Sequence, residues 1–367
     1  MKIILLSDAN SIHTQRWVES IYKHGFKVQL FSLFKPKKDL ISKYREYDIK
    51  VTSLDLKQKI KELREPNISK IKYLQSIPLL KRMIKNFNPD IVHAHYSSSY
   101  GLLGLMSGFR PLITSVWGSD IYYFPYKNIF NKWLTKLIIN YSDKICSTSV
   151  AMKQLIEREY RRFDIEVISF GIDLDLFKPS YKSKKKITVG TIKSIENHNG
   201  IDCFIDAAKI IIRDYKKDIS FIIVGEGSLK EKMQQRASNL KIENKIKFIG
   251  FVNHQNVIEY YNDISIFIAV STRESFGVAV LEAAACEIPS ITSNIGGLVE
   301  VNLHNETGIV IEPNNPEKLA ESILMLYEDE NLRSKLGKNA RKRVVENYNW
   351  EKNVSQMINL YKSYKNK

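Results

Sequence analysis

The sequence contains few cysteines and no long apolar run, and each absence excludes a class of protein. Three cysteines occur in 367 residues, far apart and without a Cys-x-x-Cys spacing. This pattern excludes a disulfide scaffold, offers no zinc site and favours a reducing compartment. No stretch approaches the roughly 18 consecutive apolar residues that a membrane-spanning helix needs.

The amino terminus also lacks the apolar core of a secretion signal. It reads MKIILLSD, in which four apolar residues separate Lys2 from Ser7. So short a run predicts a buried strand rather than a signal peptide. Because 44% of the residues are hydrophobic and 26% are charged, we expect a globular chain, and its length predicts two domains. We therefore expect a cytoplasmic protein.

Positive charge is concentrated in the first half of the chain. Residues 1–180 hold 29 basic and 17 acidic residues, an excess of 12, whereas residues 181–367 hold 27 and 23, an excess of 4. This bias favours a negatively charged partner such as an anionic membrane, with Lys57–Lys85 and Lys127–Lys136 as candidate contact stretches. The alternative is that the lysines only cover solvated faces. Nucleic acid is not expected, because no reader motif accompanies the charge.

Short apolar runs alternate with helix-length segments in both halves, which predicts parallel sheets covered by helices on both faces. The stretch Lys35–Lys72 is charged and receives no element, and a helix over Ile71–Phe87 is expected to break or kink at Pro78. The polar segment Phe177–Lys186 is the predicted linker. The predicted domains are residues 1–178 and 187–347, with residues 348–367 as a helix packing back towards the first domain. The fold class is therefore α/β, with two Rossmann-like doubly wound sheets and a ligand cleft between them.

Candidate binding residues cluster in the segment 264–297, where a buried strand leads into a helix. The backbone N–H groups of Phe276, Gly277 and Val278 would lie at the helix start, where a phosphate can bind. Glu274 precedes that helix, and Glu282 lies inside it among apolar residues. A buried carboxylate needs partners, so Glu282 is predicted to bind ligand hydroxyls. The alternatives are a charge that complements the helix dipole for Glu274 and a solvated face for Glu282.

The motif ESFGVAVLEAAACEIP, followed by SNIGGLVE, resembles the retaining glycosyltransferases of family 4, which have the GT-B fold of two Rossmann-like domains. Further matching motifs occur in the expected order along the whole chain: SDANSIHTQRW, HAHYSSSYG, SVWGSD, SFGIDLDLFKP, VGEG and FIGFV. The resemblance implies that Glu274 binds the donor sugar and that Glu282 holds the nucleotide ribose. It also implies that the helix start reaches the diphosphate, that Gly225 and Gly227 line the nucleotide site, and that Phe251 and Val252 lie against the base.

The sequence departs from the family at three positions. The usual arginine and lysine that neutralise the diphosphate are replaced by Thr191 and Asn199. Lys193 is therefore predicted to serve the diphosphate, with Arg273 as the reserve. The third departure is Trp117, which replaces a histidine that commonly approaches the reacting centre.

Three residues are the remaining acceptor-side candidates. His13 is predicted to assist proton removal from the acceptor, because an imidazole titrates near neutrality, and the alternative is a helix-capping or core histidine. His95 follows a strand, where a ligand-binding and a structural role fit equally. Asp120 is predicted either to orient the acceptor or to hold a loop, with the acceptor role preferred.

The implied reaction moves a sugar from a nucleotide-diphosphate donor, with uracil as the default base, to a hydroxyl of a glycan or lipid-linked acceptor. We expect retention of configuration, and we expect neither a cofactor nor a metal ion. The alternatives are a sugar-nucleotide epimerase of the same fold and an inactive glycan- or membrane-binding adaptor. A nicotinamide dehydrogenase is disfavoured, because no Gly-x-Gly-x-x-Gly follows the first strand.

Overall fold

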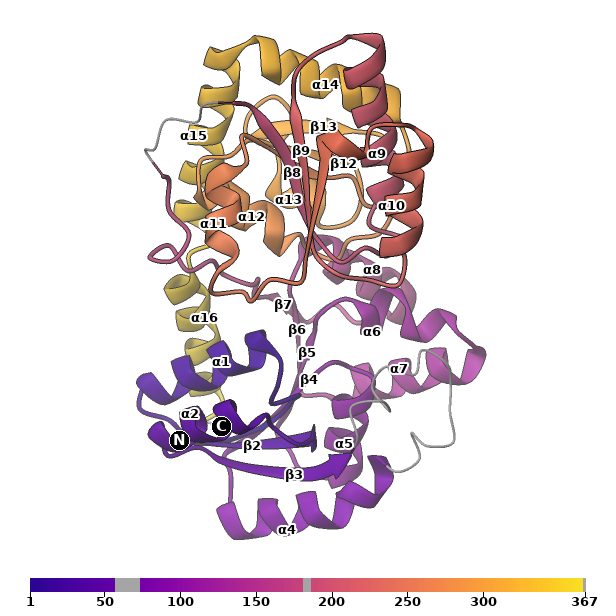
Figure 1. Cartoon of the computed structure of the whole chain (residues 1–367). Coiled ribbons are helices and arrows are strands. Elements are labelled where there is room, and N and C mark those ends of the chain that lie inside the picture. The colour runs from indigo at the N-terminus through magenta and orange to yellow at the C-terminus, as the bar shows by residue number, and fades with distance from the viewer. Residues whose placement is uncertain (57–72, 181–185, 366–367) are drawn as a thin grey trace. The chain divides into compact units, whose positions relative to one another are not determined.

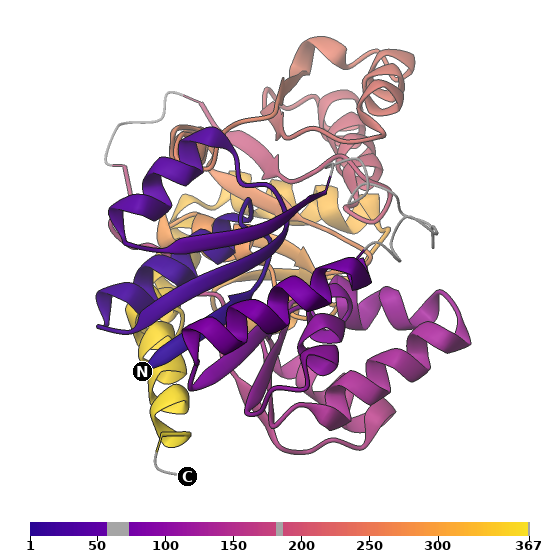
Figure 2. The same cartoon turned by 90° about the horizontal axis from the view of Figure 1, so that it is seen from below.

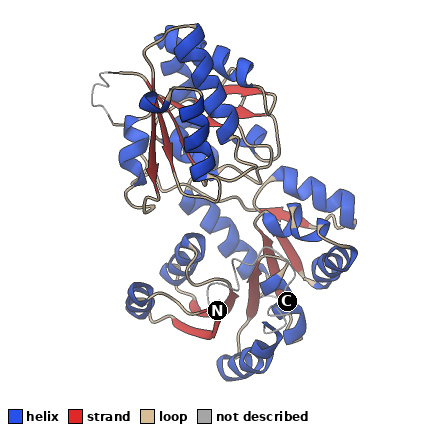
Figure 3. Cartoon of the chain, turned by 45° about the vertical axis from the view of Figure 1, so that its right-hand side comes forward, coloured by secondary structure: helices blue, strands red, loops and turns tan. Residues whose placement is uncertain are grey.

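The computed structural model describes residues 1–56, 73–180 and 186–365, which form two compact units. Unit 1 comprises Met1–Ser169 and Glu351–Lys367, and unit 2 comprises Phe170–Trp350. Each unit contains one parallel sheet with helices on both faces (Figures 1 and 3). The predicted pair of doubly wound α/β sheets is therefore confirmed.

The seven strands of unit 1 lie in the order β3-β2-β1-β4-β5-β6-β7, and all neighbours are parallel. The strands are β1 (Lys2–Leu6), β2 (Lys27–Phe34), β3 (Lys50–Leu56), β4 (Ile91–His95), β5 (Leu112–Val116), β6 (Lys144–Ser147) and β7 (Ile165–Val167). The helices are α1 (Ile12–Lys23), α2 (Lys38–Glu46), α4 (Ile77–Phe87), α5 (Ser99–Ser107), α6 (Ser119–Tyr122), η2 (Phe124–Tyr126), α7 (Ile129–Tyr141), α8 (Val150–Tyr160) and α16 (Trp350–Ser363).

The six strands of unit 2 lie in the order β10-β9-β8-β11-β12-β13, again with all neighbours parallel. The strands are β8 (Thr188–Ile192), β9 (Ser220–Val224), β10 (Ile246–Gly250), β11 (Ile266–Ala269), β12 (Ser290–Ser293) and β13 (Gly308–Ile311). The helices are α9 (Ile201–Lys209), η3 (Ile210–Asp214), α10 (Lys230–Asn239), η4 (Glu243–Lys245), α11 (Val257–Asp263), α12 (Val278–Ala285), α13 (Leu298–Val301), α14 (Pro316–Glu328) and α15 (Glu330–Asn347).

Side-chain alternation along β4 shows how the sheet of unit 1 is filled. Val92 and Ala94 join the apolar core beneath α4 and α5. Because successive strand residues face opposite sides, His93 and His95 point to the other face, where the hydroxyl of Tyr361 in α16 reaches His93. Figure 2 shows α16 beside α1 on that side of the sheet.

In both sheets the strand order reverses beside the first strand of the unit. The reversal lies between β1 and β4 in unit 1 and between β8 and β11 in unit 2. Open α/β sheets bind ligands beyond the carboxyl ends of the strands at such a switch point. In unit 2, the residues that follow β8 and β11 are therefore the place to look for a site.

The unit boundaries differ from the predicted ones. Residues 170–178 belong to unit 2 rather than to the first domain, and the chain re-enters unit 1 after Trp350. The backbone explains both, because Ile172 pairs with Asn349 in an isolated parallel bridge, and a Cβ on Gly171 would meet the Trp350 Cα at 2.4 Å. Of the predicted linker 177–186, residues 181–185 lie outside the described residues.

Several predicted elements also needed correction. The stretch Lys35–Lys72 contains α2 and the edge strand β3, whose polar residues suit a strand with one free edge. The helix predicted over Ile71–Phe87 begins only at Ile77, because Pro78 lies in the first turn of α4, where its missing N–H costs nothing. Residues 57–72, which include part of the first candidate membrane stretch, lie outside the described residues. Within the described ranges, no helix has the length and apolarity needed to cross a membrane.

Candidate active site

Lys193 lies at the switch point of unit 2, directly after β8. Its ammonium donates to the Ser271 hydroxyl at 2.7 Å and pairs with the Glu274 carboxylate at 2.5 Å. Both partners follow β11, so three polar side chains from the two central strands meet at the carboxyl end of the sheet. The side chains of Lys193 and Glu274 are 11% and 19% exposed. The pair is therefore shielded from bulk water, where its charges attract more strongly than on an open surface.

Glu274 is ionised in this setting. Burial raises the pKa of the Glu274 carboxyl, but the Lys193 charge and the hydrogen bonds from Lys193 and from two backbone N–H groups outweigh it and hold that pKa below its ordinary value. One of those donors is the Ser275 N–H, which lies 3.0 Å from Oε1. The carboxylate is thereby fixed just before the start of α12.

Glycines bring the loops after β8, β9 and β12 close to this pair. A Cβ on Gly225 would meet the Lys193 carbonyl oxygen at 2.0 Å, and one on Gly227 would meet the Ile195 carbonyl oxygen at 2.2 Å. Gly225 also has φ +145, which L side chains rarely adopt. From the other side, the Gly297 N–H donates to the Glu274 carbonyl oxygen at 3.3 Å. The VGEG and SNIGG motifs therefore act by allowing backbone to approach backbone around Lys193 and Glu274.

The segment predicted to bind a phosphate forms the start of α12. Gly277 is the N-cap residue with φ +105, and Val278 is the first helical residue. The Phe276 side chain is instead part of the core, between the rings of Phe170 and Tyr348. The N-terminal end of α12 therefore lies within a few residues of Glu274, where the helix dipole favours an anion.

Glu282 is buried, as its apolar neighbours in the sequence led us to expect, and both of its oxygens have partners. Oε1 lies 2.8 Å from the His254 Nε2, and Oε2 accepts from the Tyr261 hydroxyl at 2.8 Å. Burial and the Glu282 charge raise the pKa of Tyr261 well above its ordinary value, so the phenol stays a donor. Phe177 of the SFGIDLDLFKP motif packs against the rings of His254 and Tyr261 at 5.5 and 5.7 Å.

The positions that depart from the family pattern have structural partners. Thr191 is buried inside β8, and the Asn199 amide donates to the carbonyl and hydroxyl oxygens of Ser194 at 2.8 and 2.9 Å. Asn199 thus closes the loop that carries Lys193. The reserve cation, Arg273, is exposed in the loop before α12.

The loop after β10 carries the two residues predicted to lie against the base. Phe251 is 72% exposed, and Val252 is half-buried. His254, two residues further along, reaches Glu282. The loop is therefore joined to the predicted ribose-binding carboxylate through one side chain.

In unit 1, buried hydrogen bonds link the switch-point residues. The Ser7 hydroxyl, after β1, lies 3.0 Å from the His95 Nδ1, and the His95 ring stacks on Trp117 at 4.4 Å between centroids. His93 lies 2.6 Å from the Tyr361 hydroxyl and 2.8 Å from the Ser115 hydroxyl. Burial lowers the pKa of His93 to about 3 and that of His95 well below its ordinary value, so both are neutral.

Asp120 is enclosed and accepts hydrogen bonds from three backbone N–H groups. Ser97 donates at 2.7 Å, Gly118 at 2.9 Å and Trp117 at 3.1 Å. This geometry corresponds to the second predicted role, in which Asp120 holds a loop, rather than to the preferred one. His13 is half-buried in the first turn of α1, with its ring 5.8 Å from that of Trp117.

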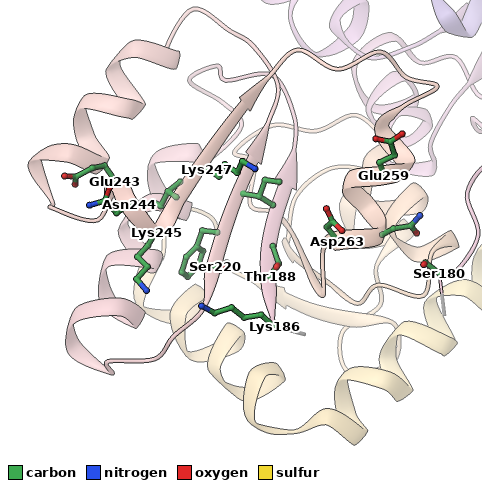
Figure 4. Close-up of a pocket in the computed structure, with 14 residues that line it drawn as sticks. Ser180, Lys186, Thr188, Ser220, Glu243, Asn244, Lys245, Lys247, Glu259 and Asp263 are labelled. Atoms are coloured by element: carbon green, nitrogen blue, oxygen red, sulfur yellow. The ribbon is translucent and has the colours of Figure 1, made fainter. Parts of the chain in front are cut away.

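A large groove in unit 2 lies away from all of these residues. Its volume is about 1020 Å³, and it is lined at the amino ends of β8, β9 and β10 by residues that include Lys186, Thr188, Ser220 and Lys245 (Figure 4). None of the predicted site residues lines it. Ligands of doubly wound sheets bind at the carboxyl ends of the strands, so the groove is not the candidate site.

Sequence reasoning missed the residues that support the two glutamates. Ser271 holds Lys193, His254 and Tyr261 hold Glu282, and the His198 carbonyl accepts from the Thr272 N–H at 2.9 Å. These contacts join segments that are distant in sequence, and no periodicity or spacing marks them. Within the described residues, no group of three His, Cys, Asp or Glu side chains could hold a metal ion.

Two family models match the chain, one in each unit. Residues 2–149 match "Glycosyl transferase 4-like", and residues 174–343 match "Glycosyl transferases group 1". The second match contains Lys193, Glu274 and Glu282.

Curated relatives with assigned activities cover most of the chain. The N-acetyl-alpha-D-glucosaminyl L-malate synthase of Bacillus anthracis is 28% identical over 291 residues, which are 75% of this chain and 74% of that protein. The UDP-Gal:alpha-D-GlcNAc-diphosphoundecaprenol alpha-1,3-galactosyltransferase of Escherichia coli is 27% identical over 325 residues, or 80% and 81% of the two chains.

A solved structure supports the fold. Anabaena Alr3699/HepE in complex with UDP aligns with a TM-score of 0.81 over 99% of this chain and 100% of that chain, at 17% sequence identity. This likeness identifies the fold, with its two Rossmann-like units, as GT-B. With both family models matched in order, the chain belongs to the group 1, family 4-like glycosyltransferases and is a glycosyltransferase enzyme.

Proposed function

We propose that this enzyme transfers a sugar from a UDP-sugar to a hydroxyl of a glycan or lipid-linked acceptor, with retention of configuration, in the synthesis of a cell-surface polysaccharide. The observation that carries the proposal is the Lys193–Ser271–Glu274 cluster at the switch point of unit 2, beside the start of α12. It combines a cation, a carboxylate and a helix N-terminus, which are the groups that a diphosphate and a sugar hydroxyl need.

In the proposed reaction, the bond between the anomeric carbon and the diphosphate oxygen breaks as a bond to the acceptor oxygen forms. Negative charge then grows on the leaving diphosphate. Lys193 and the N-terminal end of α12 stabilise that charge without a metal ion, with Arg273 as a second cation. Glu274 accepts hydrogen bonds from the sugar, and Glu282 accepts them from the ribose.

On the acceptor side, we propose that His13 takes the proton that the acceptor hydroxyl loses. It is the half-exposed member of the acceptor-side set, whereas His95 and Asp120 are enclosed. We therefore assign His95 and Asp120 as positioning residues, which act through Trp117 and the backbone around it.

The choice of base and acceptor is supported by the relatives. HepE was crystallised with UDP, and the E. coli relative acts, by its name, with UDP-Gal and a diphosphoundecaprenol-linked sugar. The excess of basic residues in the first half of the chain suits a phosphorylated or membrane-borne acceptor. We propose that the enzyme works at the cytoplasmic face of the membrane.

Calorimetric titration of UDP, GDP, CDP, ADP and NAD tests the donor site. We expect UDP to bind most tightly, and Glu282→Ala to weaken that binding by about tenfold, the equivalent of one charged hydrogen bond. Tyr215→Ala, an exposed aromatic substitution elsewhere in unit 2, is the matched control. No binding of any diphosphate would contradict the proposal.

Product analysis tests the reaction itself. With a UDP-sugar and a lipid-linked acceptor, we expect a glycoside with the anomeric configuration of the donor, read by the NMR coupling of the anomeric proton. Chelation by EDTA is expected to leave the rate unchanged. Conversion of the UDP-sugar to an epimer without acceptor would instead support the epimerase alternative.

A further inference from the structure

The helix α7 of unit 1 exposes large apolar side chains to solvent. Ile129 is 82% exposed, Phe130 61% and Trp133 56%, and Leu137 is also exposed. Figure 1 shows α7 at the margin of the unit's sheet, beside α6. The preceding turns add the exposed rings of Tyr123 and Tyr126. We call these six residues the α7 patch.

The helical period places the α7 members of this patch on one side. Positions 129, 130, 133 and 137 are separated by one, three and four residues, so they share a stripe along the helix. The opposite side of α7 is buried in the unit, through Leu134, Ile138 and Ile139 among others. The helix is thus apolar on the face that packs and on the face that does not. Soluble chains rarely leave such a continuous apolar face uncovered.

The segment that carries the α7 patch has charges of one sign only. Residues 121–141 contain three lysines and no aspartate or glutamate. Lys127 and Lys136 are exposed, and Lys132 pairs with Glu159 at 3.1 Å. The sequence alone predicted Lys127–Lys136 as a contact stretch from its charge, and the structure adds that exposed aromatic rings lie among these lysines.

This combination identifies the occupant. Protein interfaces are enriched in aromatic residues but depleted in lysine. The boundary of a lipid bilayer instead favours tryptophan and tyrosine, and anionic headgroups attract neighbouring lysines. Charge complementarity therefore favours an anionic bilayer over a second protein.

We propose that the α7 patch inserts into the interfacial region of an anionic membrane, with Lys127 and Lys136 at the headgroups, and anchors the enzyme where a lipid-linked acceptor resides. Membrane binding by the α7 patch rests on the proposed function, because a lipid-linked acceptor is the reason for the enzyme to bind a membrane. Binding of the bilayer and binding of the nucleotide involve different units, so each can fail without the other.

Intrinsic fluorescence gives a direct test on the full chain. Of the four tryptophans, Trp17, Trp117 and Trp350 are buried, and only Trp133 is exposed. We expect vesicles of phosphatidylglycerol and phosphatidylcholine to shift the emission to the blue, and lipids brominated on the acyl chain to quench it. The shift and the quenching should vanish in Trp133→Phe, although this variant keeps an aromatic ring and still binds.

Cosedimentation with the same vesicles measures the affinity. Phe130→Ser combined with Trp133→Ser should weaken binding by about a hundredfold, since burial of each large apolar side chain contributes roughly tenfold or more. Tyr215→Ser, which removes an exposed ring from unit 2, is the matched control and should bind as the wild type does. Lys127→Gln combined with Lys136→Gln should weaken binding to the anionic vesicles and leave little dependence on salt.

Three outcomes would overturn the proposal. The first is that the wild-type chain stays in the supernatant with anionic vesicles at low salt, and the second is that the serine double variant binds as well as the control. The third is that the wild type is a dimer and the double variant a monomer, because the α7 patch would then cover a second copy of the chain. UDP titration of the double variant keeps the two proposals apart. Unchanged UDP affinity shows that the variant is folded and that only membrane binding has been tested.

Discussion

Lys193 and Glu274 form an ion pair of 2.5 Å that joins the carboxyl ends of β8 and β11 in unit 2. The sequence had presented the two residues as separate ligands, one for a diphosphate and one for a sugar. In the structure each fixes the other, and Ser271 holds the ammonium from the same side. Substitution of either residue therefore changes both halves of the proposed donor site.

Removal of the Lys193 charge should impair the donor site more than an exchange of cation. Lys193→Ala should weaken UDP binding by about 10- to 100-fold, because a charged hydrogen bond contributes roughly 1.5–3 kcal/mol and Glu274 is left without its cation. Lys193→Arg keeps the charge and should retain most of the affinity. Calorimetry measures both, and equal affinity of Lys193→Ala and the wild type would remove Lys193 from the site.

A methyl group at Gly225 should disturb the loop that carries Lys193. Its Cβ would meet the Lys193 carbonyl oxygen at 2.0 Å, whereas a Cβ on Gly108 has nothing within 4 Å, although both glycines have positive φ. Gly108→Ala should therefore cost only the backbone strain, about 1–2 kcal/mol. Gly225→Ala should cost more in thermal unfolding and should weaken UDP binding. A smaller loss for Gly225→Ala than for Gly108→Ala would show that the loop moves freely.

Substitution of Asp120 should lower the stability of the fold, whereas substitution of His13 should lower the transfer rate. Asp120→Asn leaves fewer acceptors for the N–H groups of Ser97, Trp117 and Gly118, so the free energy of unfolding should fall by about 2–3 kcal/mol. His13→Asn should keep that stability and reduce the transfer rate by about 10²–10⁴-fold, as expected for loss of a general base. Urea unfolding and steady-state kinetics on both variants check this. A stable but inactive Asp120→Asn would return Asp120 to the acceptor site.

Unit 1 should lose stability as the pH falls below about 6.5. Burial lowers the pKa of His93 from 6.5 to about 3 and lowers that of His95 as well. The unfolded chain therefore binds protons between these pH values while the folded chain does not. Acidification through this window then destabilises the fold by about 1.4 kcal/mol per pH unit for each imidazole, and the contribution is fully present above 6.5.

His93→Gln should flatten that pH dependence, because it removes one of the two titrating groups. Urea unfolding followed by tryptophan fluorescence suits the test, since Trp17, Trp117 and Trp133 all lie in unit 1 and Trp117 stacks on His95. Equal slopes for wild type and variant would mean that His93 is not neutral in the folded state. Gln29→Ala, a half-buried position in β2 without a titrating group, serves as the control.

The sequence by itself determined the α/β class, the two sheets and the position of Glu274 and Glu282 around one helix start. Apolar runs that are buried on both faces can form little other than parallel strands, and a carboxylate among alanines must find partners inside the fold. Local pattern was enough for these features because they depend on neighbours within one strand–helix unit.

Only the tertiary structure decided which partners those residues have. Lys193 meets Glu274 across 81 positions, and Tyr361 reaches His93 across 268 positions. Glu282 meets His254 from the loop after β10 and Tyr261 from α11. Such contacts arise from strand order, which periodicity does not encode. The same reason explains the missed unit boundaries and the exposed face of α7, because only the structure shows which side of that helix is covered.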